Sequence, residues 1–223
     1  MNRITIQPGV CAAAALVFLG AISAEAATIV YSVNLDTSSV SGTAGFLDLQ
    51  FNPGNNTSVA ATAEIIGFSP DGGSLSGAPS VSGDVTGSLP GTVTFMNDMA
   101  LNELFQGFNF GSSVTFQVIL SGPAVGVPNA GATAGSIFGV GLYDNTQASI
   151  LTDQGGATGF SGELFLNTDG TVTPTPFPSA PGVGSVTTFA PVVVPEPGTM
   201  VLLAAGLMGL LRFRPASRLA PDA

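Results

Sequence analysis

Carboxylates are the side chains of this chain that could carry acid–base chemistry. The sequence holds 14 Asp and Glu residues against 4 Lys and Arg residues, and it has no His. A glycosidase works with two carboxyl groups, so Asp48 with Glu64 and Asp144 with Glu163 are candidate catalytic pairs. Outward strand positions are expected to be polar, and we therefore favour the alternative that these carboxylates keep a β surface soluble.

Other kinds of catalysis lack the residues that they need. A serine or cysteine hydrolase requires a base, usually His, and neither His nor Lys occurs in the chain. Transition-metal sites depend on His and Cys, and the only cysteine, Cys11, stands in an apolar N-terminal stretch. We therefore expect a protein that is not an enzyme.

Oxygen ligands make calcium the one metal to consider. Asp71 precedes two glycines, and Asn167 and Asp169 belong to the turn sequence Asn-Thr-Asp-Gly. Calcium would relieve the repulsion among carboxylates that no cation compensates. Neither stretch has the full spacing of a calcium loop, and both are also ordinary turns. We expect no cofactor, with calcium at these three residues as the alternative.

Aromatic side chains offer a second kind of binding chemistry. Tyr31, Phe108, Phe110 and Tyr143 could stack on sugar rings if they lie at the surface. Aromatic residues that recur with period two are also typical of a β core, and the chain has no Trp to form a broad stacking platform. Both interpretations stay open, and the first supports a glycan-binding module.

Strands must position all of these residues, because apolar and polar residues alternate with period two in much of the chain. Residues 97–105 fit a helical turn or a strand. Since parallel strands would need crossover helices that the pattern lacks, we predict an all-β fold, an antiparallel β-sandwich or jelly roll. The predicted strands cover residues 29–35, 45–51, 59–65, 81–85, 92–96, 114–120, 136–143 and 159–167.

The N-terminus has the features of an export signal. Arg3 precedes an apolar stretch over residues 10–22, and Ala24 and Ala26 flank Glu25 in the small-x-small pattern that signal peptidase accepts. Residues 1–26 are therefore predicted to be a signal peptide with a helical apolar segment. The β-sandwich ectodomain is predicted to span residues 27–173.

The exported body is acidic throughout, since no Lys or Arg occurs between Arg3 and Arg212. Nucleic acids and anionic lipids are held by Lys and Arg, so this body would repel both. Prolines recur over residues 174–194, which predicts an extended stalk.

The C-terminus combines three features in a fixed order. Pro195, Glu196 and Pro197 are followed by an apolar run over residues 200–211, and Arg212 and Arg214 come directly after it. A helix of this length spans about 18 Å against a hydrocarbon core of about 30 Å. We predict a short transmembrane helix that serves as a transient anchor, with the arginines on the cytoplasmic side.

This order closely resembles the PEP-CTERM sorting signal of exported Gram-negative bacterial proteins, which here covers residues 195–223. The resemblance implies that exosortase recognises Pro195, Glu196 and Pro197, that residues 200–211 enter the membrane, and that the two arginines stop transfer. The body is also similar to an uncharacterised β-rich ectodomain of such proteins, with residues 83–91 as the suggestive stretch. That similarity implies no activity.

The sequence thus predicts an exported, non-catalytic surface or extracellular-matrix protein. Signal peptidase and exosortase are its expected partners, exopolysaccharide is a further candidate, and nucleic acid is not expected. The chain should first be anchored in the inner membrane with its ectodomain outside the cytoplasm, and then reach the cell surface or the medium. The alternatives are a glycan-binding matrix module, with or without calcium, and a carboxylate glycosidase.

Overall fold

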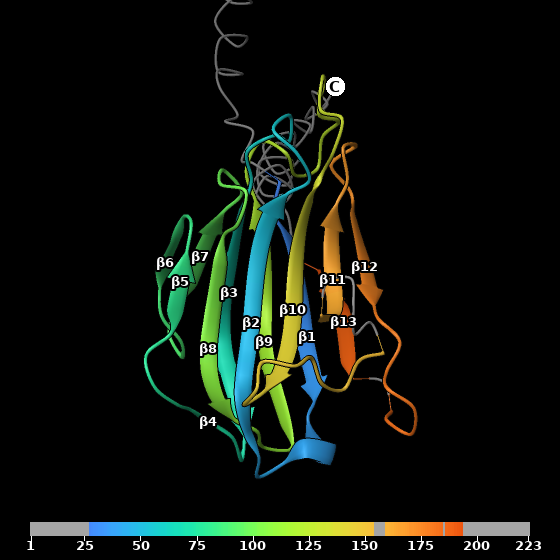
Figure 1. The fold of residues 1–223 in the computed structure, drawn as a ribbon. Coiled ribbons are helices and arrows are strands. Elements are labelled where there is room, and N and C mark those ends of the chain that lie inside the picture. Colours follow the sequence, from blue (N-terminus) through green and yellow to red (C-terminus); the bar gives the residue numbers. More distant parts are fainter. Residues whose placement is uncertain (1–26, 154–158, 185, 194–223) are drawn as a thin grey trace, which may run out of the picture. The chain divides into compact units, whose positions relative to one another are not determined.

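Strands with one apolar face build nearly all of the described chain. The structure, a computed structural model, describes residues 27–153, 159–184 and 186–193. These residues form two antiparallel sheets that pack face to face, and the sheet with β2 and β10 is in front in Figure 1. The strands are β1 (Ile29–Asp36), β2 (Ala44–Pro53), β3 (Thr62–Asp71), β4 (Ser74–Leu75), β5 (Ser80–Ser82), β6 (Val85–Gly87), β7 (Val93–Met96), β8 (Glu103–Asn109), β9 (Ser113–Ser121), β10 (Ser136–Asp144), β11 (Phe160–Leu166), β12 (Val172–Pro176) and β13 (Thr187–Val192).

The strand order identifies the kind of sandwich. Sheet A has the order β13-β1-β9-β3-β7-β6, and sheet B has the order β12-β11-β10-β2-β8-β4, with β5 also paired to β8. The pairs β1 with β9, β2 with β8 and β3 with β7 are nested, as in one long hairpin wound around the core. This nesting is the pairing of a jelly roll. The prediction of an all-β antiparallel sandwich is confirmed.

The inner faces of the two sheets form the core. In β2, Leu47, Leu49 and Phe51 are fully buried, as their alternation with Asp48 and Gln50 predicts. Phe95 of sheet A meets Phe138 of sheet B edge to face, with ring centroids 6.3 Å apart. Each such side chain stabilises the fold by about 1.5–3 kcal/mol when buried. In the described residues, which contain no cation, apolar burial must therefore provide much of the stability.

The predicted proline-rich stalk over residues 174–194 is wrong for much of its length. Strand β12 extends to Pro176 and pairs with β11, and β13 pairs with β1 through Val192. Both strands lie at the edge of their sheet. The outer side of an edge strand has no partner strand, so a proline without an N–H removes no hydrogen bond on that side. The ectodomain therefore continues to Val192 instead of ending at residue 173.

Two buried amides shape the stretch that the sequence left undecided. Strand β8 begins at Glu103, and the residues before it are irregular. The Asn97 Nδ2 atom donates to the Val59 carbonyl and the Ser136 hydroxyl, at 2.9 and 2.7 Å. The Asn102 Nδ2 atom donates to the Phe51 carbonyl at 3.0 Å. Side-chain bonds thus hold the irregular residues 97–102, whereas residues 103–105 of the same stretch belong to strand β8.

The predicted signal helix within residues 1–26 and the predicted transmembrane helix over residues 200–211 lie outside the described residues. Within the described ranges, no helix is long and apolar enough to cross a membrane. A short 3₁₀ turn, η1 (Ser38–Val40), follows β1.

Candidate functional site

The outer face of sheet B carries an unusual arrangement of glycines and rings. Gly139 and Gly141 of β10 point outward between inward-facing core residues. A Cβ atom on Gly139 would lie 2.3 Å from the Phe160 ring, and one on Gly141 would lie 2.7 Å from the Tyr143 ring. The two glycines therefore make room for the Phe160 and Tyr143 rings over this part of the sheet. These rings cover part of a surface that would otherwise face solvent.

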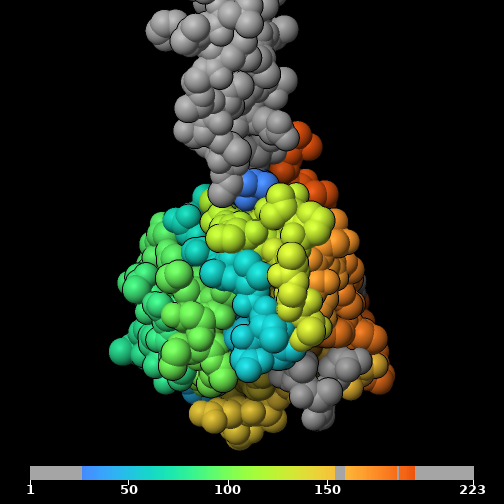
Figure 2. Space-filling model, turned by 90° about the horizontal axis from the view of Figure 1, so that it is seen from above, coloured from blue at the N-terminus to red at the C-terminus, as the bar shows by residue number. Residues whose placement is uncertain are grey.

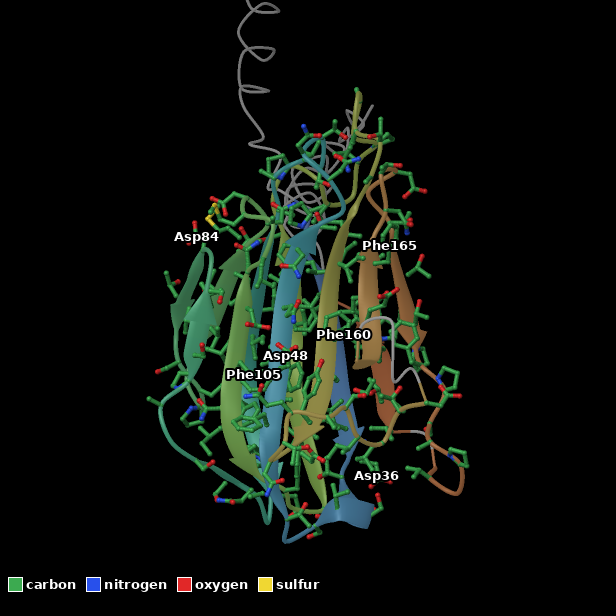
Figure 3. All side chains as sticks on the ribbon, in the orientation of Figure 1. Asp36, Asp48, Asp84, Phe105, Phe160 and Phe165 are labelled. Carbon is green, nitrogen blue, oxygen red and sulfur yellow. The ribbon has the colours of Figure 1, made fainter. Side chains whose placement is uncertain are left out.

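Asp48 lies beneath this cover although it faces outward. Its neighbours across the sheet are Phe105 on β8 and Gly141 on β10, and Figure 3 shows Asp48 between Phe105 and Phe160. The Phe105 and Tyr143 ring centroids are 5.8 Å apart, although their strands lie on opposite sides of β2. As a result, Asp48 is only 2% exposed.

An amide joins Asp48 to a second carboxylate. The Gln50 Nε2 atom donates to Asp48 Oδ2 at 2.7 Å and to Glu103 Oε1 at 3.0 Å. Asn52 Nδ2 in turn donates to Gln50 Oε1 at 2.8 Å, which fixes the orientation of the Gln50 amide. The other oxygen, Asp48 Oδ1, is buried and has no hydrogen-bond partner among the described residues. Asp48 and Glu103 therefore share the Gln50 amide as a donor, while Asp48 Oδ1 receives no hydrogen bond from the described residues.

These surroundings change the ionisation of all three acidic groups in the cluster. Burial raises the pKa of Asp48 to about 7, and the negative charge of Glu103 adds to this rise while the Gln50 hydrogen bond opposes it. Burial also raises the pKa of Glu103. Burial raises the pKa of Tyr143 to about 12, and the charges of Asp48 and Glu103 add to the effect. The cluster therefore binds and releases a proton near neutral pH.

A pocket opens beside this cluster on the same face. It has a volume of about 430 Å³, and Phe46 and Phe105 supply its aromatic part. Their rings are stacked, with centroids 4.7 Å apart. A second pocket, of about 450 Å³, is lined by the amides Asn55, Asn56 and Asn97 and contains no aromatic residue. Of these two pockets, only the first combines aromatic rings with polar groups, a combination that is typical of small-molecule sites.

The two predicted carboxylate pairs do not converge. Asp48 faces outward from sheet B, whereas Glu64 lies on β3 of sheet A between the inward-facing Ala63 and Ile65. Glu163 is opposite Gly139 on β10, and Asp144 lies at the far end of that strand. At about 3.4 Å per residue this offset is about 17 Å. The structure brings Asp48 together with Glu103 instead.

The residues predicted as calcium ligands lie at opposite ends of the sandwich, with Asp71 at the end of β3 and Asn167 and Asp169 in the turn between β11 and β12. Asp71 Oδ2 accepts a hydrogen bond from the Ser112 hydroxyl at 2.6 Å. Asp169 Oδ1 accepts bonds from the Thr171 N–H and hydroxyl, and Asn167 Nδ2 donates to Thr171 and Thr173. Within the described ranges, no three His, Cys, Asp or Glu residues gather closely enough to hold a metal ion.

The predicted stacking residues divide into two groups. Tyr31, Phe108 and Phe110 belong to the hydrophobic core, so they are unsuited to stacking on a ligand. Tyr143 is half-buried and lies on the outer face of sheet B. The sequence prediction missed Phe46 and Phe105 as surface rings. Phe46 stands next to the inward-facing Leu47, so period two would have placed it outside, while Phe105 fell in the undecided stretch.

The terminal site residues Ala24, Ala26, Pro195, Glu196, Pro197, Arg212 and Arg214 lie outside the described residues. Residues 193–214 match the family described as the PEP-CTERM protein-sorting motif. This match confirms the resemblance found in the sequence, and it supports export, processing by exosortase and sorting to the surface. No curated protein and no solved structure matches the chain significantly.

Proposed function

We propose that the protein is an exported, non-catalytic surface or extracellular-matrix protein that reaches its destination through its C-terminal signal. The observation that carries this proposal is the sorting motif at residues 193–214. Exosortase is the partner that acts on this motif, and signal peptidase acts at Ala24 and Ala26. The jelly roll is the part delivered to the surface.

The chemistry of the ectodomain supports a role without catalysis. No residue between positions 27 and 193 is His, Lys, Arg or Cys, so a Ser or Thr nucleophile has no usual base to activate it. Asp48 and Glu103 lie close enough for acid–base work, but the Phe105 and Tyr143 rings cover Asp48. A covered acid does not reach the bond of a bulky substrate, which argues against a glycosidase.

The route to the surface follows from the terminal segments. The apolar run over residues 200–211 is short for a bilayer, and Arg212 and Arg214 hold its end on the cytoplasmic side. We propose a transient anchor in the inner membrane with the ectodomain outside the cytoplasm. Processing near Pro195, Glu196 and Pro197 then frees the ectodomain for the cell surface or the medium.

Replacing all three residues Pro195, Glu196 and Pro197 by Ala in the native host tests this proposal. The variant should stay in the inner-membrane fraction, whereas the unchanged protein should reach the surface or the medium. Pro215→Ala, just outside the matched residues, is the control and should behave as the unchanged protein. Equal release of the triple variant and the control would refute sorting through this motif.

A second candidate function is glycan binding by the ectodomain. It is favoured by the partly exposed stacked rings of Phe46 and Phe105 on the outer face of sheet B. The candidate is proposed with or without calcium, because Asp71 lies at the opposite end of the sandwich from Asn167 and Asp169 and these three residues do not form one calcium site. Pull-down on glycan beads with calcium and with chelator tests it, and retention in neither condition would remove it.

A further inference from the structure

The pocket beside Asp48 has a floor and two walls. Stacked rings of Phe46 and Phe105 form the floor, together with Gly107. Ser76, Gly77 and Ala78, in the loop between β4 and β5, form one wall together with Ser80 at the start of β5. Asn145 and Gln147, in the turn after β10, form the other wall, and Figure 2 shows this turn (gold) projecting from the domain. Segments distant in sequence thus enclose one hollow.

Buried contacts hold the first wall in place. Gln106 is 2% exposed, and its Nε2 atom donates to the carbonyls of Ser76 and Gly77 at 3.0 and 3.3 Å. The Ser76 N–H donates to the Gly107 carbonyl at 2.8 Å. A Cβ atom on Gly107 would lie 2.4 Å from the Ser76 carbonyl oxygen, so the close approach requires glycine. The wall is therefore fixed before any ligand arrives.

Asp144 holds the second wall. Its Oδ1 atom accepts hydrogen bonds from the Thr146 N–H and hydroxyl and from the Ala148 N–H, at 2.8, 2.7 and 3.0 Å. These bonds lower the pKa of Asp144, so the carboxylate stays charged. Gln147 has a φ of 64°, a conformation that is uncommon for residues other than glycine. The carboxylate and the backbone make the bonds of this turn, which leaves the exposed Asn145 and Gln147 amides to face a ligand.

The lining of the pocket indicates an uncharged ligand. None of its residues is ionisable. The rest of the described domain carries carboxylates and no basic side chain, so an anionic ligand would be repelled. Ring faces pack against the C–H face of a pyranose, and amide side chains both donate to and accept from hydroxyl groups. The volume of about 430 Å³ is within the range of small-molecule sites.

We propose that this pocket binds pyranose units of a neutral glycan, with Phe46 and Phe105 stacking on the sugar and with Asn145 and Gln147 bonding its hydroxyl groups. The inference rests on the second candidate function, and it adds the site and the class of glycan. Binding needs no metal here, since the pocket offers amide, hydroxyl and backbone groups and no carboxylate.

Affinity electrophoresis of the full chain in mild detergent tests the proposal. The gels contain a neutral β-glucan, mannan or galactan, or else alginate as an anionic probe and chitosan as a cationic probe. At least one neutral polysaccharide should retard the protein. Phe105→Ala should weaken that binding about five- to tenfold through loss of stacking. Gln147→Gly should also weaken it, and this change keeps the backbone conformation because glycine adopts positive φ freely.

Phe165→Ala is the matched control. Phe165 is a partly exposed phenylalanine on β11 of the same sheet, outside the pocket. Its replacement should leave binding unchanged. Three outcomes would each overturn the proposal. The protein could be retarded only by alginate or chitosan, it could be retarded by none of the probes, or the Phe105 and Phe165 variants could bind equally well. Because localisation is not measured, these outcomes leave sorting through the C-terminal motif intact, and failed sorting would leave the electrophoresis unaffected.

Discussion

Asp48→Asn should stabilise the protein in neutral and alkaline solution. The folded protein holds the Asp48 proton to a higher pH than the unfolded chain does, because burial raises this pKa from 3.8 to about 7. The contribution of Asp48 to stability is therefore fully present below about pH 4 and is lost as pH rises through about 7. The free energy of unfolding falls by about 4 kcal/mol as this contribution is lost.

Asn has nearly the shape of a protonated Asp and never ionises. Its side-chain oxygen can still accept the Gln50 hydrogen bond that Asp48 Oδ2 accepts at 2.7 Å. At pH 8 the variant should therefore be more stable than the unchanged protein by up to about 4 kcal/mol, or roughly 10 °C in melting temperature. At pH 4 the two proteins should be about equally stable.

Urea unfolding of the full chain, followed by far-ultraviolet circular dichroism at pH 4, 6 and 8, measures this difference. Asp169→Asn is the control, because Asp169 lies exposed in a turn and hydrogen bonds from Thr171 lower its pKa. The control should gain no stability at pH 8. A gain for Asp48→Asn that is equal at all three pH values, or absent at pH 8, would refute the conclusion that Asp48 is a buried acid with a raised pKa.

Three further predictions follow from the charges and the close contacts. Glu103→Gln removes the charge that helps to raise the pKa of Asp48, so the fall in unfolding free energy between pH 4 and 8 should become smaller; an unchanged fall in the same urea titration would contradict this. Gly139→Ala should cost about 1–3 kcal/mol in urea, because its Cβ atom would meet the Phe160 ring, whereas Gly184→Ala, with open space around it, should cost far less. Trypsin should leave residues 4–211 uncut even in urea, since no Lys or Arg occurs there, and an internal tryptic peptide seen by mass spectrometry would oppose this.

Period-two alternation was a reliable guide to the strands of the core. It placed Leu47, Leu49 and Phe51 inside and Asp48 and Gln50 outside, as the structure does. It misread the proline-rich segment, because a proline is compatible with both an extended stalk and an edge strand. The composition does not show whether a partner strand is available, and here β1 and β11 provide one each.

The candidate site was harder to predict, because it depends on pairing between distant strands. The alternation predicts that Asp48 faces outward, and an outward carboxylate is normally solvated. The burial of Asp48 follows from its register, which sets it opposite Phe105 and Gly141 and under the Tyr143 ring. Register across strands β8, β2 and β10 is a property of the folded sheet, so a single sequence did not reveal the pair formed with Glu103.

Mass spectrometry of the mature protein from its native host tests the central claim, export and processing through the two terminal signals. We predict an N-terminus at Ala27 and a C-terminus that lies before the apolar run at residues 200–211. A mature chain that is intact through Ala223 would contradict processing at the PEP-CTERM motif.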